Sequence, residues 1–376
     1  MIDPTRASQP STRTTLVLPR MLASEVEDSP LRQRLPTLLR LAEQGSVSRL
    51  AALPDAETPE VMLLGMDPTL GQMRQGPLTV SALGADPPER STHFHLSLMS
   101  LHEGIAARVG VRIPADEQAK ILELGKRLNT PLLTSVAGDQ TDHGLVWEAF
   151  GDLETTPASE IEGQDPQTHF PAGDGDRLLR RFIDDSVNLL SEQEFNVRRA
   201  EAGLPTLNLL WPWGHGVRLP MPNLALRRGE PAMVLSGGLR LAGLARLVGY
   251  RNGDRSLLGN GLNAKWEVIL DRVRQWNGPT LVVVDAFEGL SDAGKTEEMH
   301  WLLREIDKRF LEPLMDASLL NPTRLTILAT GRAGGLALRW DSTLRKNGVD
   351  PFDERAFEES RLPEYQLWEA AAMGFS

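Results

Sequence analysis

The 376-residue chain contains no cysteine. This absence excludes disulfide bonds, thiolate zinc sites, iron–sulfur clusters and cysteine nucleophiles together, because each of them needs a thiol. It also means that cysteine usage gives no indication of the cellular compartment.

A long hydrophobic run is absent as well. The first fourteen residues, MIDPTRASQPSTRT, contain two arginines and several hydroxyl side chains, but no apolar segment of signal-peptide length. No later stretch approaches the length of a membrane span. We therefore expect a soluble, cytoplasmic protein that does not bind a membrane, with residues 1–13 as a loose tail.

Charge of either sign is not concentrated in any long run. The chain has 40 Lys and Arg against 51 Asp and Glu, which gives a net charge of −11. Nucleic acids and anionic membranes are bound through basic surfaces, because phosphate must meet positive charge. The composition therefore argues against a nucleic-acid-binding protein.

Strand-like and helix-like segments alternate in the second half of the chain. The expected strands are 232–237, 280–287 and 324–331, and the helices between them are 239–249, 263–276 and a long helix that ends near Leu314. Such alternation implies parallel strands joined by right-handed crossovers. The pattern predicts an α/β protein with a doubly wound, mainly parallel sheet, whose ligands bind where Asp285 and residues 330–335 leave the strands.

A smaller α+β domain is predicted to interrupt this core. We assign residues 1–84 and 177–376 to the core and residues 85–176 to the inserted cap domain. The short apolar run 61–65 indicates a strand, and the Gly- and Pro-rich segment 66–90 is typical of a connection. Residues 154–176 lack apolar periodicity, which predicts an exposed loop.

The segment Gly289–Thr296 matches the phosphate-loop pattern G-x-x-x-x-G-K-[ST]. In a phosphate loop the first glycine follows the strand directly, so that backbone N–H groups converge on the phosphates. Here residues 285–288 intervene, and two of the four are carboxylates. A capped helix N-terminus explains the segment without a ligand, so nucleotide binding through Gly289–Thr296 stays an alternative.

Six longer segments carry a resemblance to a known family: LLGMDPTLGQMRQGPLTVSALG (63–84), FNVRRAEAGLPTLNLLWPWGHG (195–216), MVLSGGLRLAGLARLVGY (233–250), LLGNGLNAKWEVIL (257–270), VVVDAFEGLSDAGKTEEMHWLLREIDKRFLEPLM (282–315) and PFDERAF (351–357). In this order they resemble the archaeal-type, 2,3-bisphosphoglycerate-independent phosphoglycerate mutases of the alkaline phosphatase superfamily. The resemblance covers about residues 60 to 360 and implies an alkaline-phosphatase-like core in a divergent, bacterial-looking member.

The resemblance implies a site with two metal ions, usually Mn or Zn, held by Asp and His at strand ends, and a serine nucleophile. The matching positions depart from that set. This sequence has Pro19 and Arg20 for the first aspartate, Ala56 and Glu57 for the nucleophile segment, and Thr330, Gly331 and Arg332 for the late ligand pair. Only Asp285 matches a metal ligand, so we interpret it as the remnant of a degenerate metal site and expect no metal cofactor.

A second group of residues suggests an anion-binding pocket. Two tryptophans, a histidine and an arginine follow a predicted strand in a Gly- and Pro-rich segment, and Asn and Arg residues retained from the family pattern lie just before it. The candidate ligand-binding residues are Asn196, Arg198, Trp211, Trp213, His215 and Arg218. The alternative is a hydrophobic corner in which both indoles cover the core.

Histidine is scarce, with seven in the chain. His93 and His95 lie two apart on the predicted strand 91–100, so both point to one face and could chelate a metal. A hydrogen-bonded sheet face explains the same spacing.

Three functional hypotheses follow. The first is a phosphoglycerate-mutase-like protein that has lost metal-dependent phosphoryl transfer and has a binding or regulatory role, with a small anionic metabolite or a protein as partner. The second is an active mutase, or a related phosphotransferase or phosphatase, with Mn or Zn in a rearranged site built from His93, His95, His215 or Asp285. The third is the nucleotide-binding protein.

Overall fold

The computed structural model describes residues 12–22, 35–52, 59–66, 73–259, 261–331, 334–344 and 364–375. The chain forms two compact units. The core unit contains Met1–Gln72 and Pro222–Ser376, and the inserted unit contains Met73–Met221. Residues 1–11, which form most of the predicted tail, and the segment 351–357 lie outside the described residues.

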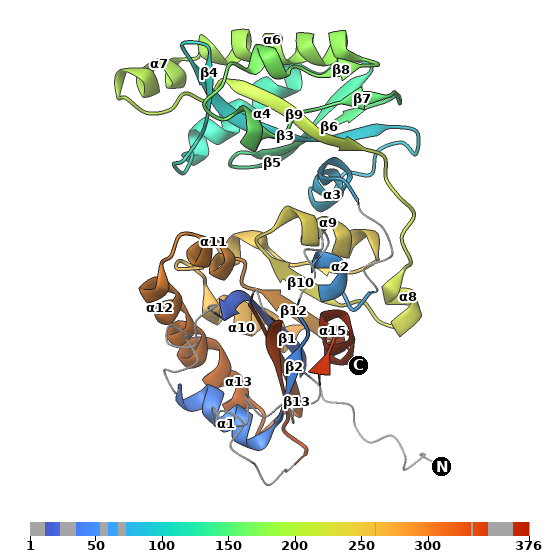
Figure 1. Cartoon of the computed structure of the whole chain (residues 1–376), viewed down its shortest axis with the longest axis vertical. Helices are drawn as coiled ribbons and strands as arrows, with labels where there is room; N and C mark the ends of the chain where they lie inside the picture. The colour runs from blue at the N-terminus through green and yellow to red at the C-terminus, as the bar shows by residue number, and fades with distance from the viewer. Residues whose placement is uncertain are drawn as a thin grey trace. The chain divides into compact units, whose positions relative to one another are not determined.

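The core unit is built on a mainly parallel sheet (Figure 1). Its strand order is β11-β10-β12-β1-β13-β14-β2-β15. The first five of these strands are parallel to one another, and β14 is antiparallel to both of its neighbours. The strands are β1 (Thr12–Leu22), β2 (Ser46–Leu50), β10 (Met233–Ser236), β11 (Arg251–Asn252), β12 (Pro279–Val283), β13 (Thr323–Gly331), β14 (Gly334–Asp341) and β15 (Glu364–Tyr365).

Helices cover both faces of this sheet, as predicted for a doubly wound α/β fold. They are α1 (Pro36–Gln44), α2 (Pro59–Leu63), α8 (Leu224–Arg228), α9 (Leu239–Leu247), α10 (Trp266–Gln275), α11 (Ala286–Asp292), α12 (Thr296–Ile306), α13 (Glu312–Ala317) and α15 (Leu367–Phe375). A π-helical turn, η6 (Asp307–Leu311), joins α12 to α13, and a 3₁₀ turn, η5 (Arg255–Leu257), precedes α10.

The two faces of strand β1 pack against different helices. Leu16 and Leu18 belong to a buried cluster with residues of α1, α10, α12 and α13. On the other face α15 lies close to the strand, since a Cβ atom at Gly374 would be 2.1 Å from Thr15 Oγ1. Because both faces are buried, the inner strands are almost continuously apolar, as in the segment Thr280–Val284.

The inserted unit contains a second, antiparallel sheet. Strand β3 pairs with β9 along one edge and with β6 and β4 along the other, and β5 extends the sheet beyond β6. The strands are β3 (Thr92–His102), β4 (Ile105–Arg108), β5 (Leu133–Asp139), β6 (Asp142–Trp147) and β9 (Leu209–Gly216), with a separate pair formed by β7 (Leu153–Glu154) and β8 (Ala172–Gly173).

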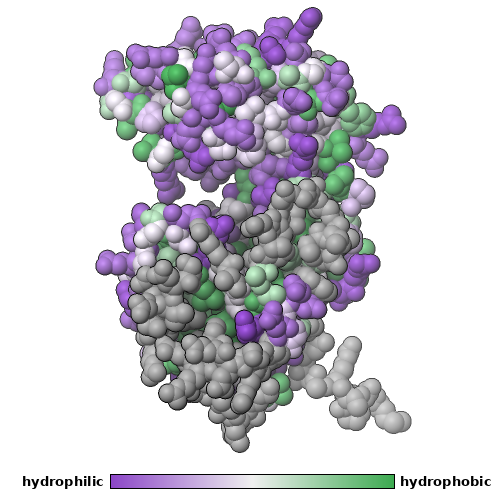
Figure 2. Space-filling view, in the orientation of Figure 1, coloured by the Kyte–Doolittle hydropathy of each residue, from purple (hydrophilic) through white to green (hydrophobic). Residues whose placement is uncertain are grey.

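Helices of the inserted unit pack on this sheet through periodic apolar faces. They are α3 (Gln75–Ala82), α4 (Ala115–Arg127), α5 (Ala158–Ile161), the 3₁₀ turn η4 (Pro166–His169), α6 (Asp176–Ser191) and α7 (Glu194–Glu201). In α6 the buried residues Leu179, Phe182, Ile183, Ser186 and Leu190 recur at helical spacing. Figure 2 shows that hydrophilic residues predominate on the visible surface of this unit.

The predicted domain boundaries differ from those of the structure. The prediction placed residues 177–221 and 73–84 in the core, but α6, α7, β9 and α3 belong to the inserted unit. The physical reason is strand pairing: β9 forms a ladder with β3 from Leu209 to Gly216, and α3 packs on both strands. An apolar pattern identifies a strand but not the sheet that it joins.

Two local predictions are wrong. The run 61–65, expected as a strand, lies largely in helix α2, because a short apolar run fits a buried helix as well as a buried strand. The segment 154–176 is not only an exposed loop. It contains α5, whose Ala158 and Ile161 are buried in a cluster with Trp211.

No helix in the described ranges combines the length and the apolar character that are needed to cross a bilayer.

A buried carboxylate in the π-helical turn η6 anchors helix α1. Helix α1 has no side-chain cap of its own and has Pro36 in its first turn. Asp307 Oδ1 accepts a hydrogen bond from Leu38 N at 2.8 Å, and its Oδ2 accepts one from Thr37 N at 3.3 Å. Burial raises the pKa of Asp307, and these hydrogen bonds act against the shift. Asp307 therefore supplies the N-terminal cap of α1 from a distant segment.

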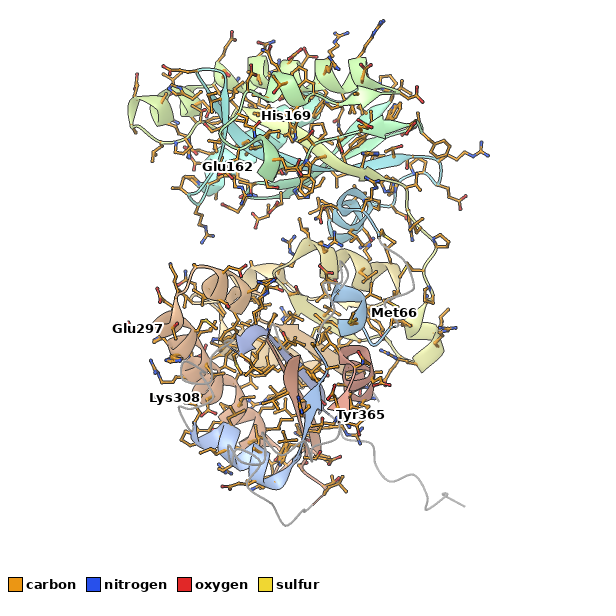
Figure 3. The ribbon with its side chains drawn as sticks, in the orientation of Figure 1. Met66, Glu162, His169, Glu297, Lys308 and Tyr365 are labelled. Atoms are coloured by element: carbon orange, nitrogen blue, oxygen red, sulfur yellow. The ribbon has the colours of Figure 1, made fainter. Side chains whose placement is uncertain are left out.

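We predict that Asp307→Ala lowers the free energy of unfolding by about 2–3 kcal/mol, because two backbone donors of α1 lose a charged acceptor. Urea unfolding measures this change. The control is the adjacent, exposed Lys308 (Figure 3), whose replacement by Ala should cost less than about 0.5 kcal/mol. Equal losses in the two variants would contradict the capping role.

Candidate functional site

The carboxyl ends of four parallel strands of the core sheet meet at one edge. Ser236 ends β10, Asp285 follows β12, Arg20 lies near the end of β1, and Thr330 lies near the end of β13. In doubly wound sheets this edge is where ligands bind. It is therefore the first candidate functional site of the core unit.

Asp285 is an internal hydrogen-bond acceptor at this edge. Its Oδ2 accepts hydrogen bonds from Ser236 Oγ at 2.9 Å, from Gly237 N at 2.8 Å and from Gly238 N at 3.1 Å. Burial raises the pKa of Asp285, and the bonds from Ser236, Gly238 and Gly237 act against this shift. Asp285 Oδ2 thus accepts the hydrogen bonds that the turn between β10 and α9 donates, and this oxygen is fully used as an acceptor.

Arg20 stands on the neighbouring strand in an unusual backbone conformation, with φ of 51°. Its backbone N donates to Thr330 Oγ1 at 3.1 Å. Its guanidinium lies 2.6 Å from Asp292 Oδ1 and 3.5 Å from Glu288 Oε1, both on α11. The edge of the sheet therefore carries a fixed cation whose counter-charges come from α11.

These residues do not fit a site for two metal ions. In the ranges that the structure describes, no group of three or more His, Asp and Glu side chains is arranged to hold a metal. His300, on α12, is the only histidine in the sequence of the core unit. Asp285 is a carboxylate bound to protein donors, and Arg20 cannot coordinate a cation. Ala56, Glu57 and Arg332 lie outside the described residues.

The phosphate-loop pattern does not form a phosphate-binding loop. Gly289 lies inside helix α11, where its carbonyl accepts from Ala293 N at 3.1 Å, and Gly294, with φ of 64°, makes the turn into α12. Lys295 is paired with Glu298 at 3.9 Å. The backbone N–H groups that would hold phosphates are thus part of a helix, and the segment is the turn that joins α11 to α12.

Arg255 lies over the same edge from the turn η5, and no motif in the sequence pointed to it. Its Nε donates to Gly237 O at 3.1 Å. Its terminal N–H groups have no partner among the described residues, and the residue is half-buried. Arg255 therefore holds a second guanidinium beside the Ser236–Gly238 turn.

The six candidate residues of the inserted unit do not form one pocket. Asn196 and Arg198 are on α7, near the start of β9, whereas His215 and Arg218 are at and beyond its end. Asn196 is buried and bonds to the backbone of Leu190 and Leu207, and Arg198 pairs with Glu194 at 2.8 Å on the surface. This part of the prediction needs correction, because the polar atoms of Asn196 hold the chain itself.

Both tryptophans also bond within the protein. Trp211 is fully buried and donates to Thr156 O at 2.8 Å, and Trp213 donates to Ser97 Oγ at 2.8 Å. His215 lies 2.9 Å from Thr155 Oγ1, and burial lowers its pKa, as does the nearby Arg74. Arg218 is half-exposed and pairs with Asp86 at 3.0 Å. The alternative interpretation, in which the indoles cover the core, describes this segment best.

His93 and His95 are buried on one face of β3, where α3 covers them. His95 Nδ1 lies 2.8 Å from Thr79 Oγ1, and His95 Nε2 lies 3.2 Å from Asp142 Oδ1. A hydroxyl, an imidazole and a carboxylate in line resemble a nucleophilic triad. Thr79 is fully buried, however, so no substrate reaches its hydroxyl. The Thr79–His95–Asp142 interactions therefore hold α3 on the sheet.

Other histidines are accounted for similarly. His169 lies on the turn η4 (Figure 3), is half-buried, and its Nε2 is 2.7 Å from Gln164 Oε1. His93 Nε2 lies 2.9 Å from Ser91 Oγ, and burial lowers the pKa of His93 to about 4, with Arg218 adding to the shift. His143, on β6, was not singled out in the sequence. Burial lowers its pKa to about 4 as well.

Comparisons with known proteins agree with this architecture. The family model of the 2,3-bisphosphoglycerate-independent phosphoglycerate mutases matches residues 50–196. The 2,3-bisphosphoglycerate-independent phosphoglycerate mutase 2 of Methanothermobacter thermautotrophicus is 23% identical over 358 residues, which are 89% of this chain and 88% of that protein.

Two solved structures share the fold. A cofactor-independent phosphoglycerate mutase from Thermoplasma acidophilum has a TM-score of 0.61 at 18% identity, with 96% of this chain and 98% of that chain covered. A protein from Pyrococcus horikoshii has a TM-score of 0.69 at 14% identity, with 97% of each chain covered. The fold is thus that of the alkaline-phosphatase-like α/β proteins. Within that class, the chain is similar to the 2,3-bisphosphoglycerate-independent phosphoglycerate mutases.

A buried ion pair next to Asn196 gives a first prediction for this region. Arg199 is 4% exposed, pairs with Glu117 at 2.9 Å and donates from Nε to Pro205 O at 2.7 Å. Arg199→Gln should cost about 3 kcal/mol of stability, because the largely buried Glu117, whose side chain is 14% exposed, is left without its cation. Arg198→Gln, in the adjacent exposed pair, should cost less than about 1 kcal/mol. Urea unfolding of both variants tests the contrast, which similar midpoints would contradict.

The second prediction concerns acid stability. Burial lowers the pKa of His143 from 6.5 to about 4 in the folded chain. Asp142, the backbone of Gln140 and Asp139 oppose the shift, and His95 adds to it. Between these pH values the unfolded chain binds the extra proton, so this contribution to stability is complete above pH 6.5 and is lost as pH falls toward 4.

We therefore expect wild-type protein to lose more stability than His143→Gln on going from neutral pH to a pH midway through this window. The measurement is the urea midpoint at each pH. His102→Gln, at a histidine whose side chain is 78% exposed, is the control and should keep the wild-type dependence. The same pH dependence in all three proteins would show that His143 is not buried as a neutral group.

Proposed function

We propose that this phosphoglycerate-mutase-like protein does not carry out metal-dependent phosphoryl transfer and uses the fold for binding or regulation, in the cytoplasm. The observation that carries the proposal is the charge at the carboxyl edge of the core sheet. Arg20 stands at the position where the family resemblance expects a metal ligand, and Asp285 Oδ2 is bound by three protein donors.

Two-metal phosphoryl transfer needs several anionic or imidazole ligands that hold both cations a few ångströms apart. A guanidinium at this edge repels a divalent cation, and its pairing with Asp292 and Glu288 uses the nearest carboxylates. Because the core sequence has one histidine, His300, imidazole ligands are also scarce there. These features support binding rather than metal chemistry at the edge.

A small anionic metabolite is the ligand that this edge suits best, with a protein partner as the alternative. Arginine recognises carboxylate and phosphate through paired N–H groups. The Arg255 guanidinium, held by Gly237 O and with unpaired terminal groups among the described residues, is the side chain that supports an anion there. Ser236 and Thr330 add hydroxyl groups at the same edge.

We predict that the purified protein, loaded with Mn²⁺ or Zn²⁺ and then dialysed, holds no stoichiometric metal by elemental analysis. Its turnover of 3-phosphoglycerate should equal background, and Asp285→Asn should leave both results unchanged. The Methanothermobacter relative, assayed in parallel, checks the conditions. Two tightly bound ions per chain, with turnover that Asp285→Asn abolishes, would overturn the proposal and favour the active-mutase hypothesis.

A further inference from the structure

A narrow cleft runs beneath helix α4 in the inserted unit. Its walls are mainly apolar, formed by Leu96, Ile121, Ala137 and Leu210, and a volume of about 40 Å³ in it is open to water-sized molecules. Since a water molecule needs roughly 10–15 Å³ measured this way, the cleft has room for about three or four non-hydrogen atoms. The cleft is separate from the carboxyl edge of the core sheet, and neither Trp211 nor Trp213 lines it.

An unpaired hydrogen-bond donor lies at the floor of this cleft. His143 lines the cleft and is 4% exposed. Its Nδ1 accepts a hydrogen bond from Gly138 N at 3.1 Å, so Nδ1 carries no proton and the neutral ring has its proton on Nε2. Nε2 is buried and has no partner among the described residues. A buried donor without an acceptor costs free energy that an incoming oxygen would recover.

Helix α4 leaves space at the cleft through a glycine. Gly125 is buried in the helix, yet a Cβ atom placed there would meet no atom within 4 Å. Glycine in the interior of a helix is unfavourable relative to alanine. Glycine at this position therefore leaves space beside the cleft that a larger side chain would fill, at a cost to the helix.

The chemistry of the cleft selects its occupant. Water needs two to four polar partners, and the cleft offers one free donor among apolar walls. Ser135 Oγ, which also lines the cleft, is engaged with Gly125 O at 3.3 Å and Asn129 Oδ1 at 2.8 Å. A carboxylate would be buried without a buried cation, because Lys126 at the rim is exposed.

We propose that this cleft binds a small neutral carbonyl compound, a ketone, aldehyde or amide, whose oxygen accepts a hydrogen bond from His143 Nε2 and whose alkyl groups contact Leu96, Ile121 and Leu210. A small displacement of the wall side chains brings the oxygen to the nitrogen. For a ligand of about four atoms the dissociation constant is no tighter than about 0.05 mM.

The test uses the full chain and three probes of one shape: acetone, acetate and isopropylammonium. Long-range proton–nitrogen NMR reports the ring nitrogens of His143, which His143→Gln identifies. Acetone should shift the Nε2 signal saturably at neutral pH. Isopropylammonium, which has no acceptor, should leave it unchanged, and acetate should bind at least about tenfold more weakly, since its charge is left unpaired.

Two substitutions at Gly125 form a matched pair. Gly125→Ala should stabilise α4 and keep acetone binding within about threefold, whereas Gly125→Leu fills the space and should weaken binding at least about tenfold. If Gly125→Leu does not fold, His143→Phe replaces it. That variant keeps a ring and removes the donor, so the acetone-dependent shift of the Ala137 methyl group should disappear.

Three outcomes would overturn the proposal. They are the absence of a saturable acetone shift at concentrations that leave the protein folded, an equal response to isopropylammonium, and unchanged acetone binding in folded Gly125→Leu or His143→Phe.

Discussion

Parallel pairing of β1 with strands from the far end of the chain is the constraint on which the core unit depends. Leu16 lies opposite Val282 of β12 and opposite Ile327 of β13 in the central register. The sheet therefore closes only when segments some 260 to 310 residues apart along the chain meet. The closure entropy of a loop grows slowly with its length, so the intervening chain can hold a complete second unit at little extra cost.

The same register determines where polar residues accumulate. The register brings the carboxyl ends of these parallel strands to the same level, so residues 20, 236, 285 and 330 share one edge whatever their chemistry. Arg20 and Asp285 are the charged residues among these, and each of the two charges has a partner within the protein. Arg20 pairs with α11, and Asp285 accepts from the β10–α9 turn. Arg255 is the charged group at this edge whose terminal N–H groups stay free among the described residues.

The sequence predicts the core fold well and the sites poorly. Runs such as Thr280–Val284 are buried on both faces, and this alone identifies central parallel strands. The assignment of β9 to the core is wrong because its apolar residues suit either sheet, and only pairing with β3 decides between them. Asn196 and Trp211 are residue types that suit an anion site, but their donors are already bound to backbone. Asn196 donates to the carbonyls of Leu190 and Leu207, and Trp211 donates to the carbonyl of Thr156. Residue type and spacing do not reveal whether a donor is already occupied.

His143 illustrates the converse limit. His143 is a lone histidine at the start of an alternating segment, and no sequence motif identifies it as a binding residue. Its proposed role depends on three features that come together only in the folded chain. The β5–β6 turn places Gly138 N on Nδ1, which fixes the tautomer and turns Nε2 into a donor. The pairing of β6 with β3 places His143 opposite Leu96, on the face that α4 covers. Gly125 then leaves that helix without a side chain at the cleft.

The family model matches the segment 50–196, which contains these residues around His143 and none of the four residues at the core edge. The two proposed binding sites therefore lie in different units, so substitutions at Arg255 and at His143 can test them independently.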